Sequence, residues 1–226
     1  MVESSQVSDP RAEHFGFLCR RCTRCCHNKR IQVNPYEIAR LARRFGQSTS
    51  AFGAASTEGG AGNYLNRTDS GACVFLGPEG CTVHEDRPLV CRLYPLGRHV
   101  SADGTERFSH MTPHPQTESE INDRGTIGEF LATQGAAPFM RAADEYANWV
   151  RHAIAALGGG IDRPAPGDHA EGFDLVDMDA AIAAHCAAAG IDEPADIEAR
   201  KALHLTILYR QLEEVEGGDD AQGGNA

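Results

Sequence analysis

The sequence has few aromatic side chains and no long apolar run. Only 7% of its 226 residues are Phe, Trp or Tyr, and a single tryptophan is present. No stretch of about 18 apolar residues occurs, so we expect no transmembrane helix. The N-terminal segment lacks the basic and apolar regions of a signal peptide, and we therefore predict a cytoplasmic protein. In that compartment thiols stay reduced, which disfavours disulfides and favours metal binding or thiol chemistry for the eight cysteines.

The negative charge of the chain is unevenly distributed. The formal net charge is −11, yet residues 19–44 contain eight Lys or Arg side chains and one acidic residue, Glu37. We interpret these cations as charge partners of clustered thiolates, whose mutual repulsion is otherwise costly. A nucleic-acid interface is disfavoured, because the total charge is acidic and no aromatic residues interleave with the arginines. We expect the partner to be a small-molecule or protein substrate of unknown identity, with no membrane contact.

Local patterns predict a mainly α protein with a small β-hairpin. Residues 34–46 form the best-marked helix, with an asparagine to cap it, a proline in its first turn and a glycine at its end. Residues 97–110 resemble a hairpin that turns at Asp103-Gly104. Residues 53–72 are rich in small and polar residues and read as a loop. After residue 125 the pattern changes to four helical segments. The apolar stripe of the first helix is expected to contain Ile38, Leu41, Ala42 and Phe45.

These segments predict a loop-rich, cysteine-ligated metal-binding half packed on a helical C-terminal half. The Gly/Pro-rich residues 158–172 read as a linker between helical pieces. The predicted division is a disordered N-terminal tail (1–14), a metal-binding domain (15–160), a helical C-terminal extension (161–215) and a disordered acidic, glycine-rich tail (216–226).

Seven of the eight cysteines fall into two groups. The first has the spacing C-x2-C-x2-C-C and the second C-x7-C-x9-C. A C-x-x-C loop lets two sulfurs hold one metal, and all-sulfur surroundings suit zinc or an iron–sulfur cluster. Seven thiolates exceed one tetrahedral site, so we expect either two sites or one site with spare cysteines. The predicted metal ligands are Cys19, Cys22, Cys25, Cys26, Cys73, Cys81 and Cys91.

The adjacent pair Cys25-Cys26 poses a local question. Neighbouring side chains diverge on a helix or a strand, so we expect the two thiols to have different roles or different metals. In a helical segment, Cys19, Cys22 and Cys26 share one face. In a knuckle loop, Cys19, Cys22 and Cys25 converge instead. The sequence does not choose between these two arrangements.

The remaining cysteine and the histidines are assigned more simply. Cys186 lies among alanines in a helical segment and is expected to be a small buried hydrophobe. A thioredoxin-like redox site is disfavoured, because the residues before Cys19 form a poor strand and the extra cysteines spoil the pairing. Four histidines are candidates for an eighth ligand, although each is more simply a surface or hydrogen-bonded residue: His27, His84, His110 and His114.

The two cysteine groups and their surroundings resemble the CxxCxxCC cysteine-cluster family of zinc- or iron-chelating domains. The first group and the following helix match the start of that family. The second group is similar to its "C-x-F-L … C-x-[IV]-[YH] … R-P-x-x-C-R-x-[YF]-P" stretch. The matching residues are Cys73, Phe75, Leu76, Cys81, Val83, His84, Arg87, Pro88, Cys91, Arg92, Tyr94 and Pro95.

The resemblance implies metal binding and, through the similar cluster of flagellin lysine N-methylases, an iron–sulfur cluster of the 4Fe-4S type that works with S-adenosylmethionine. An enzyme of this kind is a methyl transferase or an oxidoreductase, and no catalytic residue is identified. The alternative is a non-catalytic module in which zinc staples an interaction surface. Many members carry a further cysteine after the hairpin, and His110 or His114 is the candidate replacement here.

Three residues next to Cys91 are expected to support the site. Arg87 and Arg92 are candidates to donate hydrogen bonds to cluster sulfur or to an anionic ligand, and Tyr94 to buttress the site. For the two arginines the alternative is a local salt bridge to Glu85 or Asp86.

Overall fold

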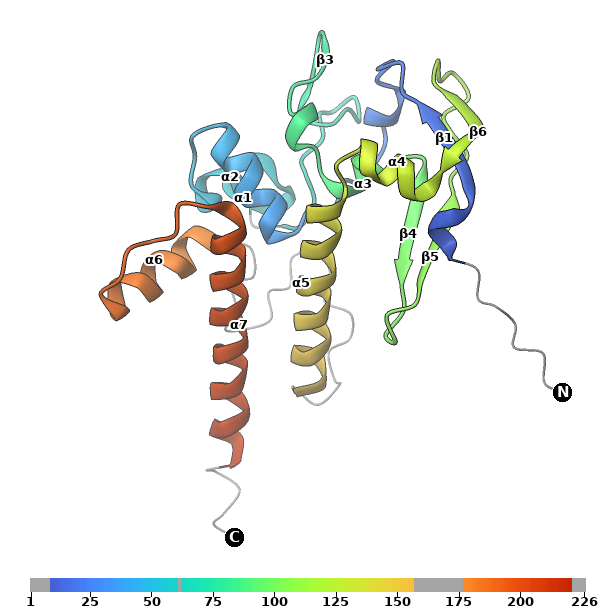
Figure 1. Cartoon of the computed structure of the whole chain (residues 1–226). Helices are drawn as coiled ribbons and strands as arrows, with labels where there is room; N and C mark the ends of the chain where they lie inside the picture. The colour runs from blue at the N-terminus through green and yellow to red at the C-terminus, as the bar shows by residue number, and fades with distance from the viewer. Residues whose placement is uncertain (1–8, 61, 157–176, 221–226) are drawn as a thin grey trace, which may run out of the picture.

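The computed structural model of the chain describes residues 9–60, 62–156 and 177–220 (Figure 1). Its fold is mainly α with small antiparallel β elements, as the sequence predicts. The helices are α1 (Pro35–Arg44), α2 (Thr49–Ser56), α3 (Leu89–Leu93), α4 (Ile127–Thr133), α5 (Ala137–Ala156), α6 (Met178–Ala189) and α7 (Ile197–Asp220). The strands are β1 (His14–Leu18), β2 (Leu76–Gly77), β3 (Gly80–Cys81), β4 (Leu96–Val100), β5 (Glu106–His110) and β6 (Glu120–Thr126).

Helix α1 starts at a reciprocal capping box, in agreement with the sequence. The side chain of Asn34 accepts a hydrogen bond from the Glu37 N–H at 3.0 Å, and the Glu37 carboxylate accepts one from the Asn34 N–H at 2.9 Å. Both bonds satisfy backbone donors that a helix N-terminus leaves without partners. Gly46 follows the helix with a φ of +62°, the left-handed geometry that ends helices.

Two hydrophobic clusters meet at α1. The large core contains the buried faces of α4 to α7 together with Tyr36 and Ala39, and Trp149 is its largest fully buried side chain. The small core lies on the other face of α1, beside the cysteine segments, and Cys73 and Cys81 pack against it. Its buried members are Val33, Ile38, Leu41, Ala42, Phe52, Leu65, Phe75 and Val83.

The β elements form three separate two-stranded sheets. The predicted hairpin is confirmed as β4 and β5, with Gly104 at φ +82° in its turn. The expectation of a poor strand before Cys19 is wrong, because β1 occupies that segment and pairs with β6. Phe17 lies opposite Ile121 in this sheet, and no local pattern reveals a partner so distant in the chain.

Helix α2 corrects part of the loop expected at residues 53–72. Ser48 caps this helix by accepting a hydrogen bond from the Ala51 N–H at 3.2 Å. Thr49 then joins it to α6, because its N–H donates to Asp179 at 2.9 Å and its hydroxyl donates to Asp177 at 2.7 Å. These contacts span more than a hundred residues, which explains why the segment reads as a loop in isolation.

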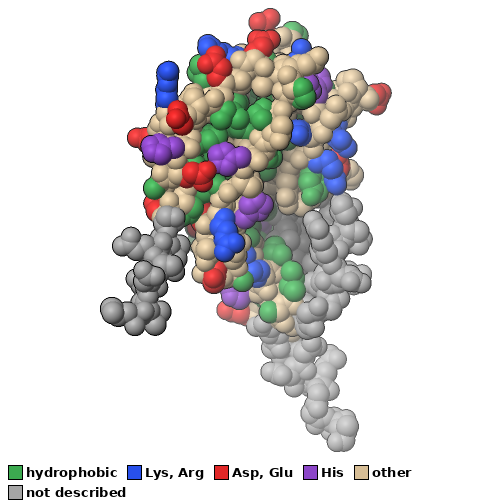
Figure 2. Space-filling view, turned by 90° about the vertical axis from the view of Figure 1, so that its right-hand side faces the viewer, with side chains coloured by type: hydrophobic (Ala, Val, Ile, Leu, Met, Phe, Trp, Pro, Cys, Tyr) green, Lys and Arg blue, Asp and Glu red, His purple; other side chains and the backbone are tan. Residues whose placement is uncertain are grey.

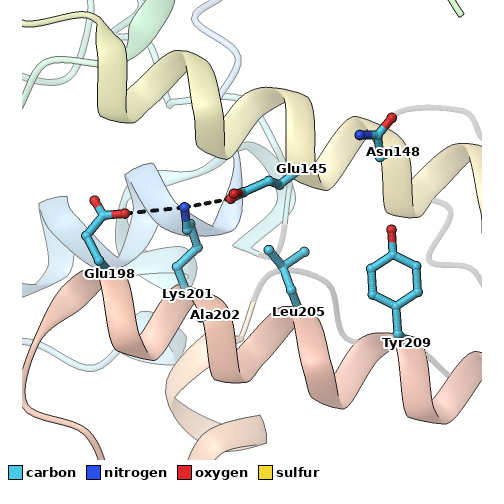
Figure 3. Close-up of a pocket in the computed structure, with 7 residues that line it drawn as sticks. All are labelled: Glu145, Asn148, Glu198, Lys201, Ala202, Leu205 and Tyr209. Carbon is cyan, nitrogen blue, oxygen red and sulfur yellow. Dashed lines mark ion pairs between the residues drawn. The ribbon is translucent and has the colours of Figure 1, made fainter.

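The four helices expected after residue 125 are confirmed as α4 to α7. Lys201 fixes α7 against α5, because its ammonium lies 2.6 Å from Glu145 and 3.3 Å from Glu198 (Figure 3). A cavity of about 310 Å³ borders this ion pair, and its lining also includes Asn148, Leu205 and Tyr209. None of the described helices is long and apolar enough to cross a bilayer.

The division into domains stays a prediction. Within the predicted tail 1–14, the short 3-10 helix η1 (Pro10–Ala12) and the start of β1 are formed, and α7 continues to Asp220. The linker expected at residues 158–172 lies outside the described residues. Figure 2 shows the β1–β6 side of the molecule, on which acidic and basic side chains are interspersed and hydrophobic side chains gather in the upper part.

Candidate metal centre

The first cysteine segment is a loop and not a continuous helix. Only the 3-10 helix η2 (Arg24–Cys26) is regular, and the backbone before and after it is strained. Arg21, Thr23 and Asn28 have φ values of 55°, 64° and 56°, which are uncommon for residues other than glycine and costly for a β-branched one. The structure therefore excludes the helical arrangement of Cys19, Cys22 and Cys26, and the convergence of Cys19, Cys22 and Cys25 stays a prediction.

The second cysteine segment presents its three thiols from different elements. Cys73 follows an extended stretch, Cys81 ends β3 opposite Leu76, and Cys91 lies in α3. The 3-10 helix η4 (His84–Asp86) connects β3 to α3. All eight cysteines of the chain are free thiols.

Backbone hydrogen bonds join the two segments. The Cys73 N–H donates to the Cys26 carbonyl at 2.9 Å, and the Asn28 N–H donates to the Gly71 carbonyl at 2.8 Å. Gly71 has a φ of +79°, and a Cβ atom there would collide with the Asn28 side chain. A glycine is thus needed where the strands approach.

Five thiols from the two cysteine segments act on one another electrostatically. Burial raises the pKa of Cys91, and negative charge on Cys73, Cys81 and Cys25 raises it further. A hydrogen bond to Cys25, burial and the charges of neighbouring thiols all raise the pKa of Cys26. Burial, followed by the charge of Cys81, raises the pKa of Cys73. Because these thiols act on one another, charging all of them needs a nearby cation.

Cys25 and Cys26 interact with each other, and whether they have different roles or different metals stays a prediction. Their thiols hydrogen-bond to each other, which lowers the pKa of Cys25 to about 7 against the effect of burial. Both residues lie in the 3-10 helix η2, at its C-terminal end.

Cys22 and Cys19 are not among these five thiols. Hydrogen bonds from the backbone N–H groups of Glu118 and Arg24 outweigh burial and lower the pKa of Cys22. Its sulfur also lies 3.6 Å from the Thr117 hydroxyl. Cys19 is exposed.

The donor set fits a soft metal, although no closed site is formed. Among the described residues, no three His, Cys, Asp or Glu side chains converge in a metal-binding arrangement. The interacting donors are all sulfur, which suits zinc or iron and disfavours magnesium and calcium. Metal binding requires thiolates and releases their protons, so a cation between these thiols removes the repulsion that raises their pKa values. The full ligand set stays a prediction.

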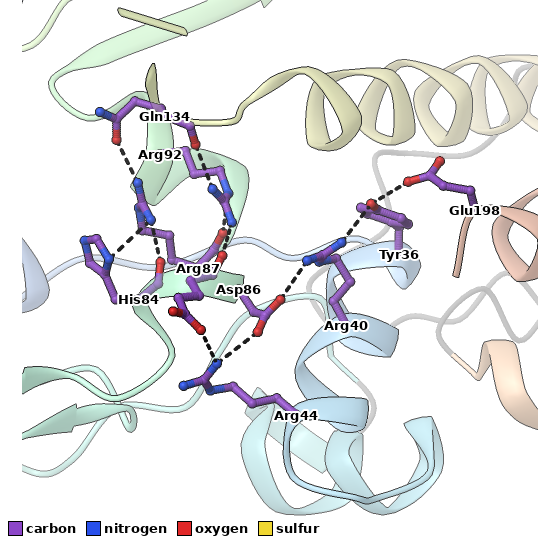
Figure 4. Close-up of polar contacts among 10 residues, drawn as sticks. Tyr36, Arg40, Arg44, His84, Asp86, Arg87, Arg92, Gln134 and Glu198 are labelled. Carbon is purple, nitrogen blue, oxygen red and sulfur yellow. Dashed lines mark hydrogen bonds and ion pairs between the residues drawn. The ribbon is translucent and has the colours of Figure 1, made fainter. Parts of the chain in front are cut away.

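Arg92 supports the backbone beneath the site. It is 6% exposed, and its guanidinium donates to the carbonyls of Arg87 at 2.9 Å, Gln134 at 2.7 Å and Glu85 (Figure 4). It also lies 3.9 Å from the centre of the Phe139 ring. Burial and neighbouring arginines lower the pKa of Arg92 to about 10. Arg92 thus bonds to three backbone carbonyls, and its expected role at the cluster stays a prediction.

Among the described residues, no salt bridge joins Arg87 or Arg92 to Glu85 or Asp86, so that alternative is wrong. Asp86 instead pairs with Arg40 at 2.8 Å on α1, and Arg44 lies near both acids. These acids face α1 because α1 packs beside η4 and carries the two arginines. The same polar chain continues from Arg40 through the Tyr36 hydroxyl at 3.3 Å to Glu198 of α7 at 2.6 Å (Figure 4).

Tyr94 and two of the histidines occupy distinct positions. The Tyr94 hydroxyl accepts a hydrogen bond from the His114 N–H at 3.2 Å, which holds the turn that reaches Thr117 and Cys22. His110 lies 2.7 Å from Glu13 through its Nε2 atom, so its ring is engaged by the N-terminal strand region. Of the two candidate replacements for the missing cysteine, His114 lies in the segment that borders Cys22.

The other two histidines lie closer to the cysteine segments. His27 forms a backbone bridge with Ala72 between the two cysteine strands. Burial and the charges of Arg87 and Arg21 lower the pKa of His84. His84 is therefore held neutral beside the second cysteine group.

Sequence reasoning missed several residues that shape the site. Glu37 is 2% exposed, and its second oxygen accepts from the Leu89 N–H at 2.6 Å, so the capping residue of α1 also holds the start of α3. The spacing from Asn34 signals the capping box, but no signal indicates the bond to Leu89. Thr117 and Gln134 were missed because their partners are distant in the chain.

Comparison with known proteins places these observations in a family. The model of the CxxCxxCC family, described as a "Putative zinc- or iron-chelating domain", matches residues 18–116. Curated proteins and solved structures give no match. The matched range contains both cysteine groups, α1 to α3 and the β4–β5 hairpin. Residues 18–116 of the chain are therefore similar to the CxxCxxCC family of zinc- or iron-chelating domains.

Proposed function

We propose that residues 18–116 bind an iron–sulfur cluster on thiolates from both cysteine groups. The observation that carries this proposal is the interaction of Cys91 with Cys25, Cys73 and Cys81, which unites thiols from separate segments. The five interacting thiols are the centre of the ligand set, and Cys19 and Cys22 complete it at its edge. One tetrahedral zinc ion and one 4Fe-4S cluster each take four thiolates, so the number of sulfurs fits either, and the resemblance to the flagellin lysine N-methylases favours the cluster.

The protein contributes the surroundings of this centre. Cys73 and Cys81 pack against the small core, which limits the access of water to their thiols. In such a weakly polar environment, interactions between charges are stronger than in water. The Thr117 hydroxyl lies 3.6 Å from the sulfur of Cys22, and Tyr94 hydrogen-bonds to His114 in the turn that carries Thr117. When bound, a cluster supplies electron exchange or an electrophilic iron.

A transferase or oxidoreductase activity with S-adenosylmethionine rests on the resemblance to flagellin lysine N-methylases. The expected result is that the loaded protein retains S-adenosylmethionine in equilibrium dialysis. No retention at millimolar cofactor would remove this branch and leave metal binding intact.

A zinc-stapled binding module is the second candidate. It is favoured by the irregular cysteine segments, which two backbone hydrogen bonds and short elements hold together. Such segments gain most of their stability from a structural metal, as small zinc domains do.

Anaerobic purification separates the two candidates. We expect a coloured protein that contains iron and acid-labile sulfide in equal amounts. A colourless protein that contains zinc alone would replace the cluster by the zinc staple. A protein that contains neither metal, and takes up neither on addition, would contradict both.

A further inference from the structure

A cavity of about 310 Å³ lies between α5 and α7 (Figure 3). Its volume falls at the lower end of the range of small-molecule sites, roughly 300–1,000 Å³. Glu145 and Asn148 line it from α5, and Lys201, Leu205 and Tyr209 line it from α7. The cavity thus combines a few polar groups with an apolar wall, which is the pattern of a small-molecule site.

One end of the cavity carries more negative than positive charge. The Lys201 side chain is 7% exposed, and its ammonium lies 2.6 Å from Glu145 and 3.3 Å from Glu198, whose side chains are 43% and 42% exposed. Arg141 also acts on Glu198, but it does not line the cavity. Two carboxylates therefore share one buried ammonium, and the lining keeps one negative charge in excess.

Glu145 is the carboxylate that a ligand can use. Glu198 engages both of its oxygens within the protein, because one accepts a hydrogen bond from the Tyr36 hydroxyl at 2.6 Å and the other faces Lys201. Glu145 engages only Oε2 with Lys201, and among the described residues no hydrogen bond reaches its Oε1 atom. An ionised oxygen of this kind accepts strongly from a charged donor such as an ammonium.

The other end of the cavity offers hydrogen-bond donors. The side-chain oxygen of Asn148 accepts from Arg151, while the amide nitrogen of Asn148 has no partner in the part of the chain that the structure describes. The His152 Nδ1 atom lies 3.0 Å from the Asn148 carbonyl, and because a carbonyl only accepts, this nitrogen carries the hydrogen. The Tyr209 hydroxyl, 3.4 Å from the same nitrogen, therefore keeps its own hydrogen for a ligand.

The spacing of the two ends indicates the size of the ligand. Glu145 and Asn148 are three residues apart on α5, which corresponds to a rise of about 4.5 Å along the helix. Leu205 lies between the two ends on α7 (Figure 3). A matching ligand has an ammonium group, an apolar chain of about four carbons and an oxygen that accepts hydrogen bonds.

We propose that this cavity binds a small organic amine, with the ammonium at Glu145 and an acceptor oxygen at Asn148 and Tyr209. An anionic ligand is disfavoured, because it would add to the negative charge of the lining. The site is separate from the proposed metal centre, since all of its lining residues lie beyond residues 18–116.

The test follows the binding of 4-amino-1-butanol to the full chain by protein NMR. This probe has the ammonium, the four-carbon chain and the hydroxyl, and we expect saturable binding with a dissociation constant on the order of 1 mM. Butanediol of the same length lacks the charge and 4-hydroxybutyrate reverses it, so both should bind about tenfold more weakly or less. Equal binding of either compound, or no saturable signal change at about 50 mM amine, would overturn the proposal.

Glu193 offers the matched control for Glu145. Its side chain is 45% exposed and lies 3.1 Å from Arg200, whose side chain is 12% exposed, so it also pairs with a largely buried cation. It lines a separate cavity of about 430 Å³ that has two acids and two arginines in its lining and therefore no excess charge. We expect Glu145→Gln to weaken amine binding by about tenfold and Glu193→Gln to change it by less than about twofold. Equal effects of the two substitutions would overturn the assignment of the ammonium to Glu145.

Two further variants decide the question if Glu145→Gln does not fold. Asn148→Ala and Tyr209→Phe leave the ion pair of Lys201 with Glu145 intact, and each removes one donor at the other end of the cavity. We expect each variant to weaken binding of the amine by about three- to tenfold. Unchanged affinity in both would overturn the proposal. A protein that binds the amine but no metal would contradict the proposed function alone.

Discussion

The backbone N–H of Cys73 donates a 2.9 Å hydrogen bond to the carbonyl of Cys26, so the two cysteine groups are joined through their main chains. A second bond of 2.8 Å joins Asn28 to Gly71 on the same pair of segments. The thiols on these segments act on each other electrostatically. Metal binding therefore acts on a pair of segments that the protein chain already holds side by side.

Gly71→Ala tests the two backbone hydrogen bonds that join the cysteine segments, Cys73 to Cys26 and Asn28 to Gly71. The new Cβ would meet the Asn28 side chain, and the φ of +79° adds strain, so we expect a loss of about 2–3 kcal/mol of unfolding free energy together with weaker metal binding. Gly104→Ala is the control, because its φ is +82° but nothing lies within 4 Å of the added atom. It should cost about 1 kcal/mol and leave metal affinity unchanged. Equal effects of Gly71→Ala and Gly104→Ala on metal affinity would show that these two hydrogen bonds do not support the metal site.

Glu37→Gln tests the link between α1 and α3. The glutamine oxygen can accept from either the Asn34 or the Leu89 N–H, and its amide group then faces the other donor. We expect a loss of about 1–3 kcal/mol in urea unfolding at pH 7. Glu129 forms the same capping box at the exposed start of α4, so Glu129→Gln should cost about 0.5 kcal/mol. Similar losses at both positions would argue against the bond to Leu89.

The pH dependence of stability follows from the same buried carboxyl. Burial raises the pKa of Glu37 from 4.5 to about 7 in the folded chain. The folded state then binds a proton that the unfolded state has released, and this contribution is present below pH 4.5 and lost as the pH rises to 7. The free energy of unfolding should fall by up to about 3 kcal/mol across that window, relative to Glu37→Gln. Parallel pH profiles for the two proteins would contradict the raised pKa.

Tyr36→Phe tests the polar connection between the metal-binding domain and α7. Tyr36 is fully buried, and its hydroxyl donates to Glu198 at 2.6 Å and accepts from Arg40 at 3.3 Å. Removal of the hydroxyl leaves the partly buried side chains of Glu198 and Arg40 without this contact. We expect the free energy of unfolding to fall by about 1–3 kcal/mol. In Tyr209→Phe, a 3.4 Å surface contact with His152 is lost, which should change stability by less than about 0.5 kcal/mol. Indistinguishable urea midpoints for the two variants would show that the connection has no stabilising role.

Features with a local cause could be predicted from the sequence. The cap at Asn34 and the turn at Gly104 depend on residues within a few positions, and both are found where expected. Strand β1 depends on β6, about a hundred residues later, and so its short sequence gave no signal. Helix α2 owes its position to contacts with α6 in the same way.

The site shows the same limit. The cysteine spacing indicated the family resemblance and the two groups, but it gave no signal for the hydrogen bond between Cys25 and Cys26 that lowers the pKa of Cys25. Arg87 and Arg92 look alike in the motif. Gln134 and Phe139, which distinguish them, lie more than forty residues away.

The most direct test of the account is the metal content of Cys91→Ser beside that of Cys186→Ser. Cys91 interacts with thiols of both groups, whereas Cys186 is 2% exposed in the large core and lies outside the site. After anaerobic purification, Cys186→Ser should keep the zinc or iron content of the original protein, and Cys91→Ser should lose most of it. Equal metal content in both variants, or none in the original protein, would contradict the account.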